Sequence, residues 1–384
     1  MLLGLVSLLT DISSEMVYPL IPLYLVGKLG ASPAIVGVIE GLAESLASLL
    51  KVFSGAVSDK FQRRKPLVIF GYGFSALSKI MIALAVSWPW VFWGRISDRF
   101  GKGVRTAPRD VLIAEAADTG KIGRAFGLHR MLDSLGAVLG VTLAFYFFTS
   151  YQGDYRAVFI WSLVPAFLGV VLLFLVRETR QKATSLKHLS FQWSSLDSRL
   201  KKFLLIAFIF ALGNSSNQFL LLRAGNLGFS VQYVILLYLV FNIVYTAAAF
   251  PAGALSDRFG RRSILVTGYV FYGLVYLGFA LVTARYYLWL LFGLYGIYSA
   301  FTEGVEKALV ADIAPAEQKA TLLGLHATIV GIGLLPASVI GGILWNYLGA
   351  SAPFYFGGSM GLGAAIGLAI ILTGEKNNKL PKVD

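Results

Sequence analysis

At 384 residues, with 57% hydrophobic and only 14% charged residues, the chain does not have the composition of a soluble domain, in which about 25% of residues carry a charge. Long apolar stretches recur throughout and predict an all-α polytopic membrane protein. The formal net charge of +13 does not indicate nucleic-acid binding, because the basic residues gather in short loops between the apolar stretches. The absence of cysteine excludes disulfides and thiolate metal sites.

Twelve apolar segments predict twelve transmembrane helices, so both termini would lie on one side of the membrane. The predicted spans are Leu2–Val26, Ala34–Ser58, Pro66–Ser87, Trp90–Ala116, Gly123–Thr149, Ala157–Val176, Phe203–Arg223, Val231–Ser256, Ile264–Ala284, Tyr286–Ile313, Ala320–Tyr347 and Pro353–Thr373. The first has no basic region or cleavage site of a signal peptide, so we interpret it as a span.

The fourth span is so rich in charge that hydropathy alone would assign it to a loop. If it did not cross the membrane, the basic loop 177–202 would lie on the opposite side from the basic loop 60–65. Basic loops gather on the cytoplasmic side, so the charge pattern places this segment in the membrane. We expect a multi-pass protein of a bacterial-type inner membrane with both termini in the cytoplasm.

The two halves of the chain resemble each other. GAVSDKFQRR (Gly55–Arg64) matches GALSDRFGRR (Gly253–Arg262) at an offset of 198 residues, and Ile113–His129 aligns with Val310–His326 at an offset of 197. Two such repeats predict two pseudo-symmetric six-helix bundles that face the same way. We assign residues 1–178 to the first bundle, 179–202 to a cytoplasmic linker and 203–384 to the second bundle.

The doubled motif resembles motif A of the major facilitator superfamily, in a form like that of drug and metabolite efflux proteins. The resemblance implies a twelve-helix fold that works by alternating access around a cavity lined by spans 1, 4, 7 and 10. Gln62 replaces the inner glycine of the first copy. A basic loop that only sets topology would account for part of the motif but not for the duplicated aspartate, so we favour a gating latch. The latch residues are Gly55, Asp59, Arg63 and Arg64, and Gly253, Asp257, Arg261 and Arg262.

A second family motif, typical of antiporters, is only partly present in span 5. Gly127, Gly136 and Gly140 have its spacing, but Val141 stands where proline is usual. Tight helix packing explains these glycines at least as well as antiport does.

Basic residues follow one face of span 4. Arg95, Arg99, Lys102, Arg105 and Arg109 recur at three- and four-residue steps. A charge at mid-membrane costs several kcal/mol unless it faces water or a partner, so we expect this stripe to face the cavity and to bind or gate the substrate. A purely structural role is the alternative. The excess of basic residues suggests a substrate with an anionic or zwitterionic group, which arginine binds through two parallel hydrogen bonds.

Acidic residues in the same region are candidates for proton coupling. Asp11 and Glu15 lie four residues apart on span 1, and Asp98 lies on span 4. A carboxyl group that alternates between buried and arginine-paired surroundings would take up and release a proton. Permanent salt bridges are the alternative, and the sequence leaves both open. Further cavity candidates are Tyr18, Asn214, Asn217, Gln218, Glu303 and Glu306.

These features predict a secondary active transporter that exports a small amphipathic or anionic molecule in a proton-coupled cycle. We expect a monomer in contact with membrane lipid, with no cofactor, metal or nucleic-acid partner. The alternatives are an importer or uniporter of an organic anion or metal complex, and a non-transporting membrane sensor. The sequence contains no Walker A motif, HExxH pair or nucleophile elbow, which argues against ATP drive and against an enzyme.

Overall fold

The computed structural model describes residues 1–61, 64–117, 122–176, 196–315 and 319–373, which form fifteen helices and, within these ranges, no strand. The first eight are α1 (Leu2–Val17), α2 (Ile21–Gly27), α3 (Pro33–Phe61), α4 (Arg64–Ala83), α5 (Trp88–Glu115), α6 (Ile122–Ser150), α7 (Tyr155–Trp161) and α8 (Leu163–Phe174). The others are α9 (Ser198–Gly213), α10 (Gln218–Asn226), α11 (Val231–Phe259), α12 (Arg261–Leu281), α13 (Tyr287–Ile313), α14 (Lys319–Leu348) and α15 (Ala352–Thr373).

Three pairs of these helices each make one interrupted span, which reduces fifteen helices to the twelve passes expected. The break between α1 and α2 contains Pro19, which cannot continue the hydrogen-bond ladder. The break between α9 and α10 covers residues 214–217, a run of Asn and Ser whose side chains compete with the helical backbone. Helices α7 and α8 meet at Ser162.

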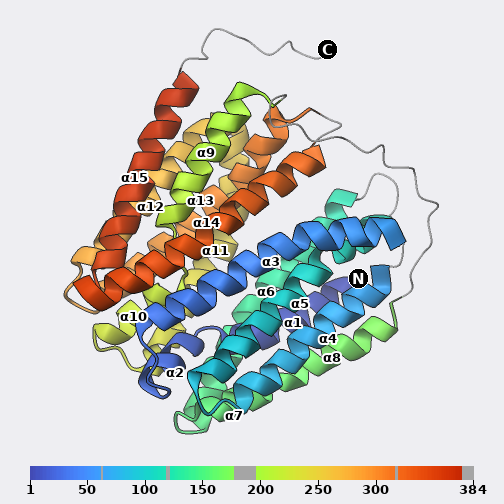
Figure 1. The fold of residues 1–384 in the computed structure, drawn as a ribbon, viewed down its shortest axis with the longest axis vertical. Coiled ribbons are helices and arrows are strands. Elements are labelled where there is room, and N and C mark those ends of the chain that lie inside the picture. Colours follow the sequence, from blue (N-terminus) through green and yellow to red (C-terminus); the bar gives the residue numbers. More distant parts are fainter. Residues whose placement is uncertain (62–63, 118–121, 177–195, 316–318, 374–384) are drawn as a thin grey trace.

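The helices are arranged as two bundles, with α1–α8 in one and α9–α15 in the other (Figure 1). Helices α3 and α14 pack together where the bundles meet. The predicted all-α, two-bundle fold is therefore confirmed. Helix α9 begins at Ser198, inside the segment assigned to the linker, and most of that segment lies outside the described residues. The domain boundaries stay a prediction.

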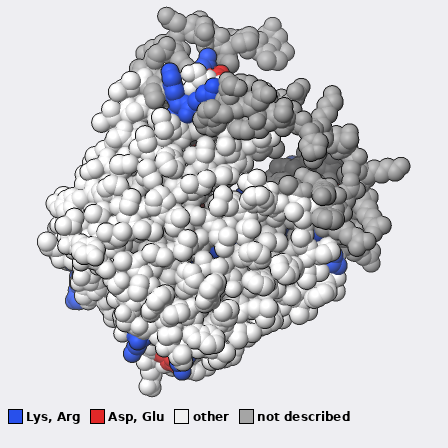
Figure 2. Space-filling view, in the orientation of Figure 1, with Lys and Arg blue, Asp and Glu red and all other residues white. Residues whose placement is uncertain are grey.

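The charged fourth span is one continuous helix, α5, which runs through Pro108. Within the described ranges, nine helices are long and apolar enough to cross a membrane by composition alone, and α5 is not among them. Loop charge therefore located a span that hydropathy misses, and the repeat offset of 197 maps Arg95–Glu115 onto Phe292–Asp312 within α13. Figure 2 shows a broad face almost free of charge between the two ends of the molecule, as expected of a surface in contact with lipid.

Candidate transport cavity

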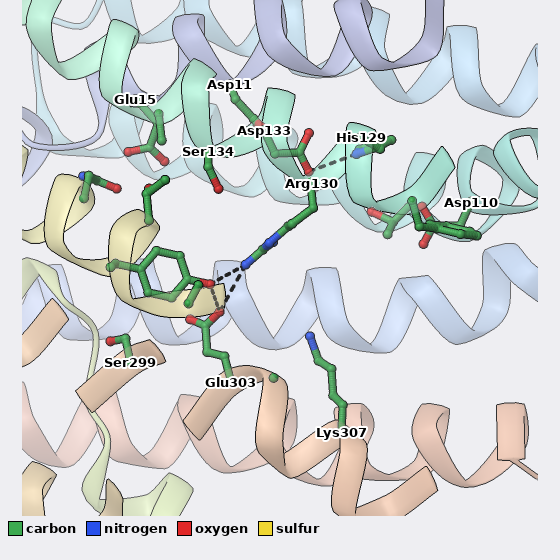
Figure 3. A pocket seen from close by; sticks show the side chains of 18 of the residues that line it. Asp11, Glu15, Asp110, His129, Arg130, Asp133, Ser134, Ser299, Glu303 and Lys307 are labelled. Carbon is green, nitrogen blue, oxygen red and sulfur yellow. Dashed lines mark hydrogen bonds and ion pairs between the residues drawn. The ribbon is translucent and has the colours of Figure 1, made fainter. Parts of the chain in front are cut away.

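A cavity of about 640 Å³ lies between the two bundles. Helices α1, α3, α5 and α6 form its wall on one side, and α11 and α13 form the other. Among the described residues, six basic and five acidic side chains line it. They are Lys51, Lys102, Arg105, Arg109, Arg130 and Lys307, and Asp11, Glu15, Asp110, Asp133 and Glu303. Figure 3 labels the five acidic residues together with Arg130 and Lys307. A polar space of this size at a bundle interface is suited to a small-molecule substrate.

The bundles close against each other at one end of this cavity. The Ser45 hydroxyl of α3 donates a 2.6 Å hydrogen bond to the Gly331 carbonyl of α14. Gly41 lies so close to α14 that an added Cβ would come within 2.9 Å of the Leu335 carbonyl oxygen. These contacts lie on the N-terminal half of α3, whereas the cavity residue Lys51 lies on its C-terminal half. The cavity therefore opens at the end of the bundles where α1 begins and α3 ends.

Asp11 and Glu15 form the floor of the cavity, as their candidate role requires. Two glycines of α6 make this position possible, because a Cβ on Gly136 would lie 3.0 Å from Asp11 Cβ and one on Gly140 would lie 3.0 Å from Glu15 Cβ. The structure thus shows a packing role for these two residues of the partial motif in span 5. The Tyr238 hydroxyl of the opposite bundle donates a 3.0 Å hydrogen bond to Glu15 Oε2.

Arg95 and Arg99, the N-terminal part of the stripe in span 4, do not face the cavity, contrary to the prediction. Arg95 donates two hydrogen bonds of 2.7 Å to Glu40 of α3. Arg99 makes a 2.7 Å ion pair with Glu44, one turn further along α3. Burial of the two arginine charges without partners would be too costly in free energy, and Glu40 and Glu44 of α3 supply the partners.

Asp98 also lies in this buried network and does not line the cavity. Asp98 Oδ1 accepts a 3.1 Å hydrogen bond from Lys79 Nζ of α4, and Asp98 Oδ2 lies 3.6 Å from Arg95 Nη1. The spacing of Glu40 and Glu44 matches that of Arg95 and Arg99, and this match was the sequence signal that would have indicated the pairing.

Lys102, Arg105 and Arg109, the C-terminal part of the stripe, line the cavity, and their role in binding or gating stays a prediction. Arg105 packs its guanidinium 4.3 Å from the centre of the Tyr72 ring and bonds to Ser75 of α4. Arg109 pairs with the neighbouring Asp110 at 2.8 Å. Lys102 is exposed to the cavity and, among the described residues, makes no ion pair within 4.0 Å.

An ion pair that sequence reasoning missed crosses between the bundles. Arg130 of α6 lies 3.4 Å from Glu303 of α13, and it also bonds to the Tyr245 hydroxyl, which donates a 2.7 Å hydrogen bond to Glu303 (Figure 3). One turn along α6, Asp133 pairs with His129 at 3.2 Å. The sequence signal for Arg130 and Asp133 was the presence of charged residues inside an otherwise apolar span, an argument that was applied to spans 1, 4 and 10 but not to span 5.

The predicted polar ligands of span 7 face the interior of the second bundle instead of the cavity. Asn214 donates a 3.3 Å hydrogen bond to the Tyr298 hydroxyl, and Asn217 Oδ1 accepts a 2.7 Å hydrogen bond from Tyr295. Gln218 is fully buried. Tyrosines of α13 therefore satisfy Asn214 and Asn217, whereas the side-chain polar atoms of Ser215 and Gln218 are buried without a hydrogen-bond partner among the described residues.

Two further candidates also lie outside the cavity lining. Glu306 accepts a 2.9 Å hydrogen bond from the Tyr269 hydroxyl and lies 3.3 Å from His326 Nε2. Tyr18 packs against Tyr238, with 5.5 Å between ring centres, and helps to seal the floor.

Two of the motif A arginines, one in each half, make similar ion pairs at the helix ends. Arg64 at the start of α4 bonds to Glu115 at the end of α5. Arg261 at the start of α12 pairs with Asp312 at the end of α13 at 2.8 Å, and it lies 3.7 Å from Asp257.

The other members of the motif are less informative. Arg262 donates a 2.7 Å hydrogen bond to the Ala369 carbonyl of α15. An added Cβ on Gly55 would lie 3.5 Å from Ala107, whereas one on Gly253 would meet nothing within 4 Å. The side chains of Asp59 and Arg63 lie outside the described residues.

Comparison with known proteins agrees with this architecture. The family model described as "Major Facilitator Superfamily" matches residues 3–222 and 203–383. An uncharacterised MFS-type transporter of Methanocaldococcus jannaschii is 38% identical over 351 residues, which cover 90% of this chain and 88% of the relative. Multidrug resistance protein MdtH of Photorhabdus laumondii is 34% identical over 138 residues, 36% of this chain and 34% of that protein. The solved structure of nucleoside transporter NupG has the same fold, with a TM-score of 0.79, 15% identity and coverage of 96% and 98% of the two chains.

Proposed function

The chain belongs to the major facilitator superfamily and is a secondary transporter, and we propose that it carries a small molecule with an anionic group in a proton-coupled cycle. The observation that supports this most directly is the position of Asp11 and Glu15 on the floor of a cavity whose lining is otherwise mainly basic. Neither carboxylate makes an ion pair within 4.0 Å among the described residues.

The two carboxylates and the anion would use the same basic groups. With all carboxylates ionised, the described lining has one excess positive charge, and protonation of Asp11 and Glu15 raises that excess to three. Lys102 attracts both carboxylates, so their protonation leaves it available to an anion. Proton binding and anion binding therefore strengthen each other, and this reciprocal coupling favours movement of both in the same direction.

Movement in the same direction along an inward proton gradient gives uptake, which was the alternative to export. Export in exchange for protons is the second candidate, because the chain resembles MdtH over part of its length, and the name of that relative states multidrug resistance. An amphipathic cation would suit exchange, since it would compete with protons for Asp11 and Glu15.

A flux assay separates these two mechanisms. The purified protein is placed in proteoliposomes with a trapped pH-sensitive dye, and a panel of carboxylates, phosphate esters and lipophilic cations is added outside. An anion that enters with protons acidifies the lumen, whereas a cation that enters in exchange for protons makes it alkaline. A panel that moves no protons in either direction would refute proton coupling.

Two conservative variants test the floor residues. Asp11→Asn and Glu15→Gln should each abolish proton-driven accumulation and spare counterflow exchange of the substrate, because exchange needs no net proton movement. Full driven transport in both variants would show that these carboxylates do not carry the proton.

We also propose that the protein lies in an inner or plasma membrane and acts as a monomer, with the open end of the cavity and both termini in the cytoplasm. The basic loops next to that end support this orientation. Protease protection of tags at the two termini in inverted and right-side-out vesicles tests it.

A further inference from the structure

Two lysines face the cavity from opposite bundles near its open end. Lys51 lies on the C-terminal half of α3, and Lys307 lies on α13. Both side chains are exposed, and Figure 3 shows Lys307 pointing into the pocket. Because the two ammonium groups line the same cavity from opposite sides, they repel each other across it.

Neither lysine has an acidic partner within 4.0 Å among the described residues, because the neighbouring acids are engaged elsewhere. Asp110, which attracts Lys51, is bound by Arg109 at 2.8 Å. Glu303, one turn before Lys307 on α13, accepts hydrogen bonds from Tyr245 and Arg130. Among the described residues, the positive charge of these two lysines is therefore not neutralised by an ion pair.

This charge opposes the movement that transport requires. Alternating access needs the open end of the cavity to close, and closure brings α3 and α5 toward α13. Like charges that approach each other at a partly desolvated position raise the energy of the closed state. An anion between the two ammonium groups would reverse the sign of that effect.

We propose that Lys51 and Lys307 form an oxyanion site shared by the two bundles, and that a carboxylate or phosphate group bridges them to allow the cavity to close. Lysine suits this role because its ammonium group binds an oxyanion as a mobile point charge from either side of a changing gap. The inference rests on the proposed function for the identity of the anion as substrate, but the repulsion itself does not depend on proton coupling.

The chain has no cysteine, so spin labels can be placed without altering native residues elsewhere. Val57→Cys on α3 and Leu255→Cys on α11 put labels at two exposed positions, one in each bundle, at the open end of the cavity. Pulsed electron paramagnetic resonance in lipid nanodiscs then measures the distance between the bundles.

Charge exchange is the first test and needs no ligand. Lys307→Glu or Lys51→Glu should replace repulsion with attraction and raise the ratio of closed to open populations by on the order of tenfold. The double exchange restores like charges and should return the distribution to that of the parent. Lys28→Glu, an exposed lysine outside the lining of this cavity, is the matched control and should change nothing. Unchanged distances in both single variants would overturn the proposal.

The second test uses inorganic phosphate and citrate as probes. At least one of them should shift the parent and the Lys28→Glu variant toward the shorter distance, and the shift should disappear in Lys51→Gln and in Lys307→Gln. No shift in the parent with either probe, or an equal shift in the glutamine variants, would exclude an oxyanion site at these lysines. Loss of proton flux with these shifts intact would instead refute the proposed coupling and leave the site in place.

Discussion

Substitution of Glu40 tests whether Arg95 belongs to a structural network and not to the substrate path. The two hydrogen bonds between these residues are 2.7 Å long, and the side chains are 0% and 3% exposed. Glu40→Gln keeps the shape of the side chain but leaves the Arg95 charge without its main partner. Breaking a buried ion pair in this way costs about 3–5 kcal/mol, and we expect a loss of that size.

The assay is reversible unfolding in mixed detergent micelles, followed by far-ultraviolet circular dichroism. Glu44→Gln, one turn further along the same helix, is the matched control, since Glu44 is 32% exposed and binds Arg99 at 2.7 Å. Partial exposure weakens such a pair, so the expected loss is about 1 kcal/mol. The double variant Glu40→Leu with Arg95→Met should lose less than Glu40→Gln, because the Lys79–Asp98 pair then remains balanced. Equal losses for Glu40→Gln and Glu44→Gln would refute the reasoning.

Three other substitutions have expected outcomes of different kinds. Arg105→Ala should reduce the thermal shift produced by an anionic ligand; an unchanged shift would leave Arg105 a structural partner of Tyr72 and Ser75. Gly140→Leu should stop transport while the protein still inserts into the membrane, because the new side chain would collide with α1 at Glu15, and normal flux would disprove this packing. Arg223→Met should cost about 1–3 kcal/mol in the unfolding assay, since Arg223 donates to the Phe279, Ala280 and Val282 carbonyls at the end of α12, and a neutral effect would show that water replaces it.

The fold could be predicted because its constraints act over the whole chain. Loop charge and the repeat both require α5 to cross the membrane, and neither depends on the hydropathy of α5 itself. The floor of the cavity was predicted in part for a similar reason, since Asp11 and Glu15 share a helical face in a span that contains few other charges.

The distribution of charge between cavity and interior could not be predicted from one helix at a time. The stripe of α5 covers one face, but which part of that face meets α3 depends on how the helices cross. Arg95 and Arg99 therefore form ion pairs with Glu40 and Glu44. Of the stripe, only Lys102, Arg105 and Arg109 reach the cavity. The inter-bundle pair of Arg130 and Glu303 was missed because it depends on the distance between bundles, which no local pattern contains.

The internal repeat also sharpens the interpretation of motif A. Glu115 corresponds to Asp312 at the repeat offset of 197, and each pairs with a motif A arginine of its own half. The partner is Arg64 in the first half and Arg261, which aligns with Arg63, in the second. Each pair joins two helices of one bundle, so these arginines hold the ends of α4 and α5, and of α12 and α13, together. Such links favour bundles that move as rigid bodies. The contacts that must break and form during transport are then those between the bundles, which include Glu15–Tyr238, Arg130–Glu303 and Ser45–Gly331.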